Sequence, residues 1–370
     1  MKRRNASPIA DLLPRRVRHF PIPLRAAMLF AVIALAATSP FAAAETCTTQ
    51  SALAPAERDG IASAARTLAA DVQADNAAAL RSASVAEVVK DFNSLQYLVG
   101  ATAPKLTGGV STVDQVYLLD ASTLKPSADG AAPNAQFFCS LNRSTMEAEF
   151  DIPALPPGKY AFAIVNIAPA PGASTTAPWR LSFLMRQEPA GQPRAGWQLA
   201  GFYPRPLTAA GHDGLWYWTQ ARELAKAKQP WNSWLYYQAA EKLLQPADFV
   251  ISTHLDKLRT EAAAAAPPEL SDGVSVDAPL VVKAADGTES HFTSLGIDDS
   301  LAQSSLDIAV HLHVDPLPDQ AAARKRNDAA AAALIAAYPE LRKLFHGVWV
   351  YAETTGQPPF ATEQPMSAIQ

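Results

Sequence analysis

The 370-residue sequence has little histidine, and it lacks the short motifs that mark common catalytic sites. It contains no G-x-S-x-G nucleophile elbow, no H-E-x-x-H zinc motif, no C-x-x-C pair and no glycine-rich phosphate or dinucleotide loop. None of its seven histidines falls between residues 52 and 205. Catalytic groups are recognised by their geometry rather than their order along the chain, so an enzyme is not excluded. The missing motifs nevertheless favour a non-catalytic protein without a bound cofactor.

Positive charge is scarce outside the first residues of the chain. The sequence has 31 Lys and Arg and 35 Asp and Glu, but seven of the basic residues and only one acidic residue precede residue 45. Removing them leaves 24 basic and 34 acidic side chains, a net charge of −10. An acidic protein is repelled by phosphate backbones and by anionic lipid head groups. We therefore expect no nucleic-acid partner, and no membrane binding once the first segment has been removed.

A hydrophobic run long enough to span a bilayer comfortably is also missing at the N-terminus. The apolar core from Ala26 to Ala37 has 12 residues and follows the basic region. It leads to Ala42-Ala43-Ala44-Glu45, which has small residues at both positions that a signal peptidase reads. We predict a signal peptide cleaved between Ala44 and Glu45 and a periplasmic or secreted protein. A retained N-terminal anchor is the alternative.

Only two cysteines are present, Cys47 and Cys139. In an oxidising compartment an even pair of cysteines more often forms a disulfide than stays reduced, so we predict a bond between them. The alternative is one terminal thiol and one buried thiol. Glu45-Thr46 before Cys47 does not fit a lipoprotein signal, so we expect no lipid anchor.

The hydrophobic pattern changes several times along the chain and predicts an α+β protein. Residues 54–100 have a helical period, and about six strands with a period of two follow over 113–203. Tyr160 to Ile167 is apolar on both faces, which predicts a central strand in an antiparallel meander. The predicted parts are a signal peptide (1–44), a cone-like α+β domain (45–206), a helical segment (207–266) and a small C-terminal antiparallel α+β domain (267–370).

Local signals predict where several of these elements begin. Ser84 and Glu87 form an S-x-x-E capping box for a helix, and Asp213 caps the first helix of the helical segment. Asp286-Gly287 is a two-residue hairpin turn between two C-terminal strands. Two more strands, at 306–314 and 348–353, flank an alanine-rich helix.

Helices followed by a curved antiparallel sheet that closes on Gly196-Trp197-Gln198-Leu199-Ala200-Gly201 resemble the nuclear-transport-factor-2-like (SnoaL-like or cystatin-like) cone. The stretch from Ala64-Ala65-Arg66 through Asp75 to Leu80 is similar to the alanine-rich helix, Asp and Leu that open many such domains. The resemblance covers about residues 52–205. It implies a superfamily of isomerases, dehydratases, hydrolases and binding modules, whose enzymes often carry an Asp–His pair. The helices at 213–246 resemble a single tetratricopeptide-type hairpin.

The sequence His311-Leu312-His313-Val314-Asp315 holds the strongest candidates for chemistry. On a strand, His311, His313 and Asp315 lie on one face, where two imidazoles and a carboxylate form the beginning of a zinc site. Ser305, Asp307 and Ala309 extend the same face, so ordinary half-exposed alternation explains the pattern equally well. We predict no catalytic, cofactor or metal residues and keep these three as candidate metal ligands.

These patterns predict an exported, non-catalytic protein that binds a small ligand or a protein partner through the cone-like domain, with the helices as a buttress. The alternative is a hydrolase, either metal-dependent through the 311–315 strand or with a catalytic pocket in the cone. An open pocket of several hundred Å³ with converging polar groups favours ligand binding or catalysis, whereas a filled cone favours a scaffold.

Overall fold

The computed structural model describes residues 45–126, 130–141, 145–171, 177–189, 191, 195–271, 273–299, 305–315, 319–356 and 358–369. They lie within one compact unit, residues 43–370. The mixture of helices and mainly antiparallel sheets confirms the α+β class. Over these ranges no helix is both long and apolar enough to cross a membrane. Ala44 of the predicted cleavage site lies outside the described residues.

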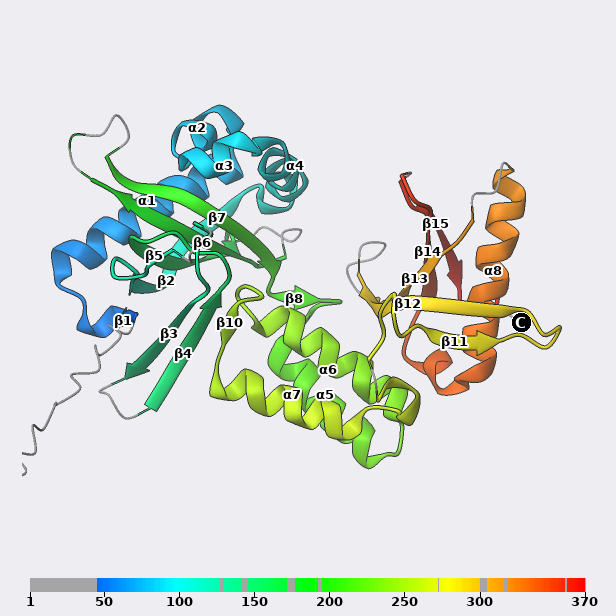
Figure 1. Cartoon of the computed structure of the whole chain (residues 1–370). Coiled ribbons are helices and arrows are strands. Elements are labelled where there is room, and N and C mark those ends of the chain that lie inside the picture. The colour runs from blue at the N-terminus through cyan, green and yellow to red at the C-terminus, as the bar shows by residue number, and fades with distance from the viewer. Residues whose placement is uncertain are drawn as a thin grey trace, which may run out of the picture. The chain divides into compact units, whose positions relative to one another are not determined.

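Four helices cover one face of a five-stranded antiparallel sheet with the order β1-β2-β5-β6-β7 (Figure 1). Burial on both faces explains why Tyr160 to Ile167 carries apolar side chains on both faces, and β5 lies between β2 and β6 as predicted. The elements are β1 (Thr46–Thr49), α1 (Pro55–Gln73), α2 (Ala77–Ser82), α3 (Ala86–Lys90), α4 (Phe92–Thr102), β2 (Gly109–Asp120), β5 (Lys159–Pro169), β6 (Trp179–Glu188) and β7 (Gly196–Pro206).

The opposite face of this sheet is covered by a second sheet of three strands, in the order β10-β4-β3 (Figure 1). Its strands are β3 (Ala135–Leu141), β4 (Thr145–Ile152) and β10 (Val250–Ile251). The predicted meander is therefore wrong in one respect, because β2 pairs with β5 and not with β3. Tyr117 and Phe162 face away from the helices, and Phe137 and Phe150 of the β3–β4 hairpin pack against them in a single cluster.

Three helices follow: α5 (Gly214–Lys226), α6 (Pro230–Leu244) and α7 (Thr253–Ala265). Asp213 caps α5 as predicted, because its Oδ1 accepts a hydrogen bond of 2.8 Å from the backbone N–H of Trp216. Gly214 allows α5 to approach α6 closely, since a Cβ there would lie 2.6 Å from Leu244 Cγ. A two-stranded ribbon of β8 (Thr208–Ala209) and β9 (His212–Asp213) precedes α5.

The C-terminal sheet has the order β11-β12-β13-β14-β15, and α8 (Gln320–Ala337) packs on it (Figure 1). Its strands are β11 (Leu280–Lys283), β12 (Glu289–Asp298), β13 (Asp307–His313), β14 (Gly347–Glu353) and β15 (Phe360–Pro365). The hairpin turn lies at Asp286-Gly287 as predicted, but it is a three-residue loop and not a two-residue one. Ala284 and Thr288 close it, because the backbone N–H of Ala284 donates to the carbonyl of Thr288 at 2.8 Å, and Gly287 has φ +89°. Short 3₁₀ turns complete the chain at Gln50–Ala52, Ala103–Leu106, Pro268–Leu270 and Pro339–Lys343.

The sequence predicted an antiparallel C-terminal sheet, and this prediction is wrong for one pair of strands. β13 and β14 are parallel, with Val310 opposite Val350. The cause is α8, which connects them as a crossover and returns the chain to the same end of the sheet. β15 was not predicted at all. The buried apolar side chains of α5 to α7 and of this sheet form one cluster. The domain boundary between residues 266 and 267 stays a prediction.

A disulfide joins Cys47 to Cys139, as predicted. Cys47 lies on β1 opposite Leu119, and Cys139 lies on β3 opposite Ala148, so the bond connects the two N-terminal sheets. The two cysteines are 92 residues apart. Closing so long a loop removes much of the conformational entropy of the unfolded chain.

We expect a Cys47→Ala/Cys139→Ala variant to lose about 4–5 kcal/mol of unfolding free energy, the value that the chain-entropy model gives for a loop of this length. Denaturation by urea, with and without a reducing agent, measures it. Reduction should destabilise the natural sequence but leave the variant unchanged. A loss below about 1 kcal/mol would show that the bond does not constrain the unfolded chain.

Candidate functional site

The three candidate metal ligands of β13 do not converge on one point. His311 Nδ1 lies 2.6 Å from Glu353 Oε1, and its ring stacks on Tyr351 with 4.9 Å between ring centroids. His313 and Asp315 are exposed. Within the described part of the chain, these three residues do not form a group whose ligand atoms all lie near one another.

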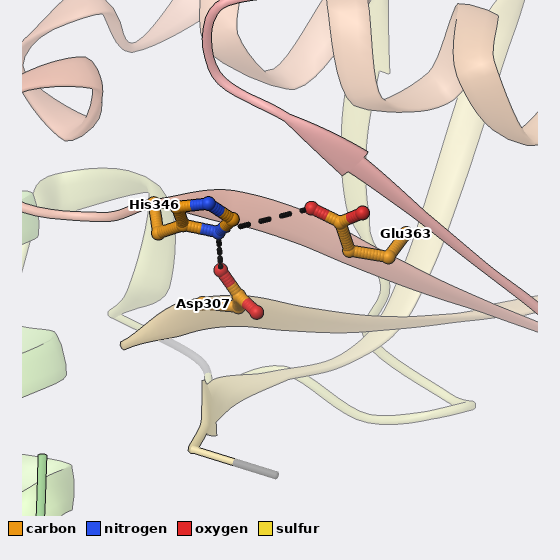
Figure 2. Close-up of side chains that lie close together, drawn as sticks. All are labelled: Asp307, His346 and Glu363. Carbon is orange, nitrogen blue, oxygen red and sulfur yellow. Dashed lines mark hydrogen bonds and ion pairs between the residues drawn. The ribbon is translucent and has the colours of Figure 1, made fainter. Parts of the chain in front are cut away.

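A different histidine and two carboxylates meet at the other end of the same strand. Figure 2 shows the His346 imidazole between Asp307 and Glu363. His346 Nδ1 lies 3.1 Å from Asp307 Oδ1 and 3.9 Å from Glu363 Oε1. One ligand atom from each residue falls within 4.8 Å of the other two. We call Asp307, His346 and Glu363 the His346 cluster.

The sheet topology brings the His346 cluster together from three segments that are distant in sequence. Asp307 begins β13, His346 immediately precedes β14, and Glu363 lies on β15 at the far side of β14. Between the two carboxylates lies Gly347. A Cβ at that position would be 3.2 Å from Asp307 Oδ1 and closer still to Glu363 Oε1, so the absence of a side chain makes room for both.

Burial makes the His346 cluster electrostatically unusual. Asp307 is only 2% exposed, and Glu363 is half-buried. Burial raises the pKa of Glu363, and the neighbouring negative charge of Asp307 raises it further, while His346 opposes the rise. Glu363 Oε1 is buried, and among the residues that the structure describes it has no hydrogen-bond partner.

A separate pocket of about 340 Å³ lies where the N-terminal sheets meet the helices. Its walls are mainly apolar, with a small number of polar groups, which is the usual composition of a small-molecule site. The lining residues are Tyr117, Glu147, Ala148, Phe162, Ile164, Leu215, Trp218, Leu244, Pro246, Val250, Ser252, His254 and Leu255. We call it the sheet–helix pocket.

The carboxylate of Glu147 is fixed at the wall of the sheet–helix pocket. Its Oε1 accepts hydrogen bonds from Tyr117 Oη at 2.9 Å and from Gln115 Nε2 at 2.6 Å. Burial, strengthened by the negative charge of Glu147, raises the pKa of Tyr117, so the phenol keeps its proton and donates. The pocket therefore presents an oriented negative charge beside apolar side chains.

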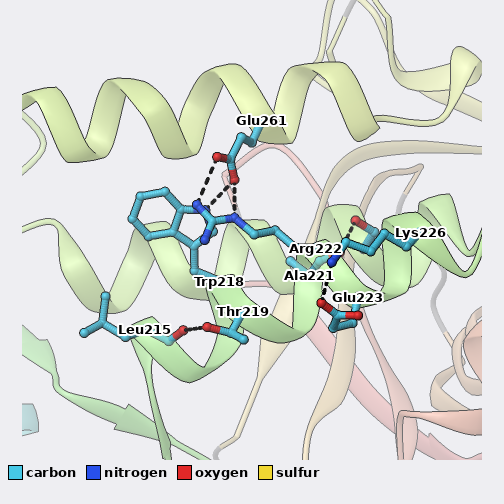
Figure 3. A network of polar contacts seen from close by, with 9 residues as sticks. Leu215, Trp218, Thr219, Ala221, Arg222, Glu223, Lys226 and Glu261 are labelled. Atoms are coloured by element: carbon cyan, nitrogen blue, oxygen red, sulfur yellow. Dashed lines mark hydrogen bonds and ion pairs between the residues drawn. The ribbon is translucent and has the colours of Figure 1, made fainter.

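The indole of Trp218 forms another wall of this pocket, and contacts with Glu261 and Arg222 fix its position. Figure 3 shows Trp218 and Arg222 of α5 side by side against Glu261 of α7. Glu261 Oε2 accepts from Trp218 Nε1 at 2.7 Å and from Arg222 Nε at 2.6 Å. The Arg222 guanidinium also lies 4.5 Å from the Trp218 ring centroid. Hydrogen bonds from Arg222 hold the pKa of Glu261 below its usual range, so the carboxylate remains ionised and the ring stays in place.

A larger cavity, of about 730 Å³, is lined by side chains of mixed character. Lys105, Lys242, Asp298 and Asp299 bring charges of both signs to it. Lys105 lies over the ring of Trp179, 5.1 Å from its centroid. Its size exceeds that of the sheet–helix pocket. Burial raises the pKa of Asp299 in its wall, and Lys242 and Lys105 oppose that rise.

Comparison with protein-family models, with curated proteins and with solved structures finds no match. The site residues therefore rest on geometry alone. Sequence reasoning missed the His346 cluster because Glu363 belongs to a strand without a clear alternating pattern. The sequence signals that point toward it are the position of Asp307 on the polar face of β13 and the glycine after His346.

Proposed function

We propose that this chain is an exported binding protein that holds one amphipathic small molecule in the sheet–helix pocket. The observation that carries the proposal is a pocket of about 340 Å³ with mainly apolar walls and one fixed carboxylate. That volume lies in the range of ordinary ligand sites. The helix-covered, curved sheet also supports a nuclear-transport-factor-2-like cone, with α5 and α6 as its tetratricopeptide-like buttress.

The chemistry of the pocket specifies the ligand class. Phe162, Ile164 and Trp218 offer an apolar surface for a ring or an alkyl chain. Glu147 offers a carboxylate that already accepts two hydrogen bonds through Oε1. A ligand with an apolar body and an N–H donor or a cationic amine satisfies both features, whereas an anionic ligand is repelled.

The neutral amine N-phenyl-1-naphthylamine, whose fluorescence rises in apolar surroundings, is a suitable probe. We expect saturable binding of one molecule per chain. Leu215 lines the pocket and is 59% exposed, so Leu215→Arg places a charged side chain there without disturbing the core. It should weaken binding at least tenfold, since about 1.4 kcal/mol of lost affinity is enough for that.

The matched control is Val276→Arg. Val276 is 72% exposed and does not line the pocket. The same change of apolar to basic side chain at this position should leave the probe affinity unchanged. Absence of saturable binding, or equal affinities for the Leu215→Arg variant and the natural sequence, would contradict the proposal.

Export is the second part of the proposal. It rests on the basic and apolar pattern before Glu45, and the Cys47–Cys139 bond supports it because disulfides persist in oxidising compartments. Expression of the full chain in a Gram-negative host should yield periplasmic or secreted protein whose first residue is Glu45. N-terminal sequencing together with cell fractionation checks this. Cytosolic protein that retains residues 1–44 would contradict export.

The hydrolase alternative through the 311–315 strand is not carried further, because His311, His313 and Asp315 do not share a position for an ion. The sheet–helix pocket lies on the face of the sheet that points away from α1 to α4, and a catalytic site there would use the same cavity as the proposed ligand. Turnover of a bound ligand distinguishes that alternative from simple binding.

A further inference from the structure

We infer that Asp307, His346 and Glu363 form a binding site for a divalent transition-metal ion, with Zn²⁺ as the best-matched ion. The sheet–helix pocket plays no part in this inference, which depends on three facts about the His346 cluster. They are the separations of its ligand atoms, an unpartnered buried oxygen, and the space that Gly347 leaves.

The separations agree with a shared ion. Bonds of 2.0–2.2 Å in a tetrahedral zinc site place neighbouring ligand atoms about 3.3–3.6 Å apart. The distances from His346 Nδ1 are 3.1 Å to Asp307 Oδ1 and 3.9 Å to Glu363 Oε1, on either side of that value. The two carboxylate oxygens lie within 4.8 Å of each other, so the Glu363 carboxylate has to move toward the ion to complete the site.

Without an ion, the cluster leaves one carboxylate oxygen without a suitable partner. A proton on His346 Nδ1 forms a hydrogen bond to Asp307, but Glu363 Oε1 is too far away to share it. That oxygen is buried and accepts no hydrogen bond from any group in the described ranges. Unpartnered buried polar atoms are costly and uncommon, and an unplaced ion is one of their ordinary explanations. An ion in place of the proton contacts all three residues.

The ligand types select the ion. Two carboxylates neutralise the charge of a divalent cation, and the imidazole favours Zn²⁺ over Mg²⁺ or Ca²⁺, which prefer oxygen ligands. The cluster is also reachable, because the His346 side chain is 49% exposed and lines a pocket of about 230 Å³ with His212 and Ser305. Three protein ligands and an accessible fourth position are typical of a zinc ion that also binds water or a substrate.

Gly347 leaves space for this arrangement. A Cβ at this position would lie 3.2 Å from Asp307 Oδ1 and closer still to Glu363 Oε1, and it would also lie 2.9 Å from the backbone carbonyl oxygen of Gln364. Glycine here therefore makes room both for the two carboxylates and for the pairing of β14 with β15.

The test uses the full chain without a histidine tag, treated with a chelator and then titrated with ZnCl₂ by isothermal titration calorimetry. The natural sequence should bind one Zn²⁺ per chain. Glu363→Gln keeps the size of the side chain and should weaken binding at least tenfold, as should His346→Ala. Circular dichroism establishes that each variant is folded.

The matched control is His311→Ala. His311 belongs to the same sheet and also contacts one carboxylate, Glu353, at 2.6 Å, but in the part of the chain that the structure describes no third metal-binding side chain joins them. Its loss should leave zinc affinity unchanged. Absence of stoichiometric binding, a folded Glu363→Gln variant with full affinity, or an equal loss in His311→Ala would each overturn the site. None of these variants alters a residue of the sheet–helix pocket, so this result and that of the probe experiment are independent.

Discussion

The burial of α6 over most of its surface is the constraint on which the arrangement of the other elements depends. Nine of its residues are buried, and they cover roughly two thirds of the circumference of the helix. The side that carries Glu241 and Lys242 stays partly exposed. A helix that is buried over so wide an arc needs neighbours on several sides. α5 and α7 pack against it, and β12 and the turn at Pro339–Lys343 also contact it.

Specific contacts connect α6 to segments far away in sequence. Asn232 Nδ2 donates to the backbone carbonyl of Glu340 at 3.0 Å, and the rings of Trp231 and Tyr338 stack with centroids 3.8 Å apart. At the other end of the helix, Arg180 of β6 donates to the carbonyls of Leu243 and Leu244. These carbonyls lack partners within the helix, so Arg180 satisfies them and anchors the end of α6 to the first sheet.

Both proposed sites depend on this enclosure. Leu244 at the end of α6 lines the sheet–helix pocket opposite the β2–β5 face, and Trp218 reaches the same pocket from α5. Tyr236 of α6 packs against Phe345, which immediately precedes His346. A loosened α6 would therefore open the pocket and release the segment that carries the histidine of the cluster.

The sequence predicted the elements whose patterns are long and regular, and it failed where an outcome depends on distant partners. The helical period of α1, the two apolar faces of β5, the cap at Asp213 and the turn glycine Gly287 are local signals, and the structure contains them.

The predicted capping box at Ser84 is wrong. The Ser84 hydroxyl donates to the carbonyl of Leu80, and Val85 is the N-cap residue of the short α3. β15 is a short edge strand that ends in proline, so its sequence has no clear alternation. The parallel pairing of β13 and β14, and with it the meeting of Asp307, His346 and Glu363, follows from the α8 crossover and cannot be read from spacing.

Native-state hydrogen exchange of the full chain tests the role of α6 most directly. If α6 and the C-terminal sheet are one cooperative unit, the slowest amides of α6 and of β13 exchange with the same opening free energy. Leu235→Ala, at a fully buried position of α6, should then lower both by the same amount, about 2–5 kcal/mol. Amides of β13 that keep their original protection while those of α6 lose theirs would contradict this account.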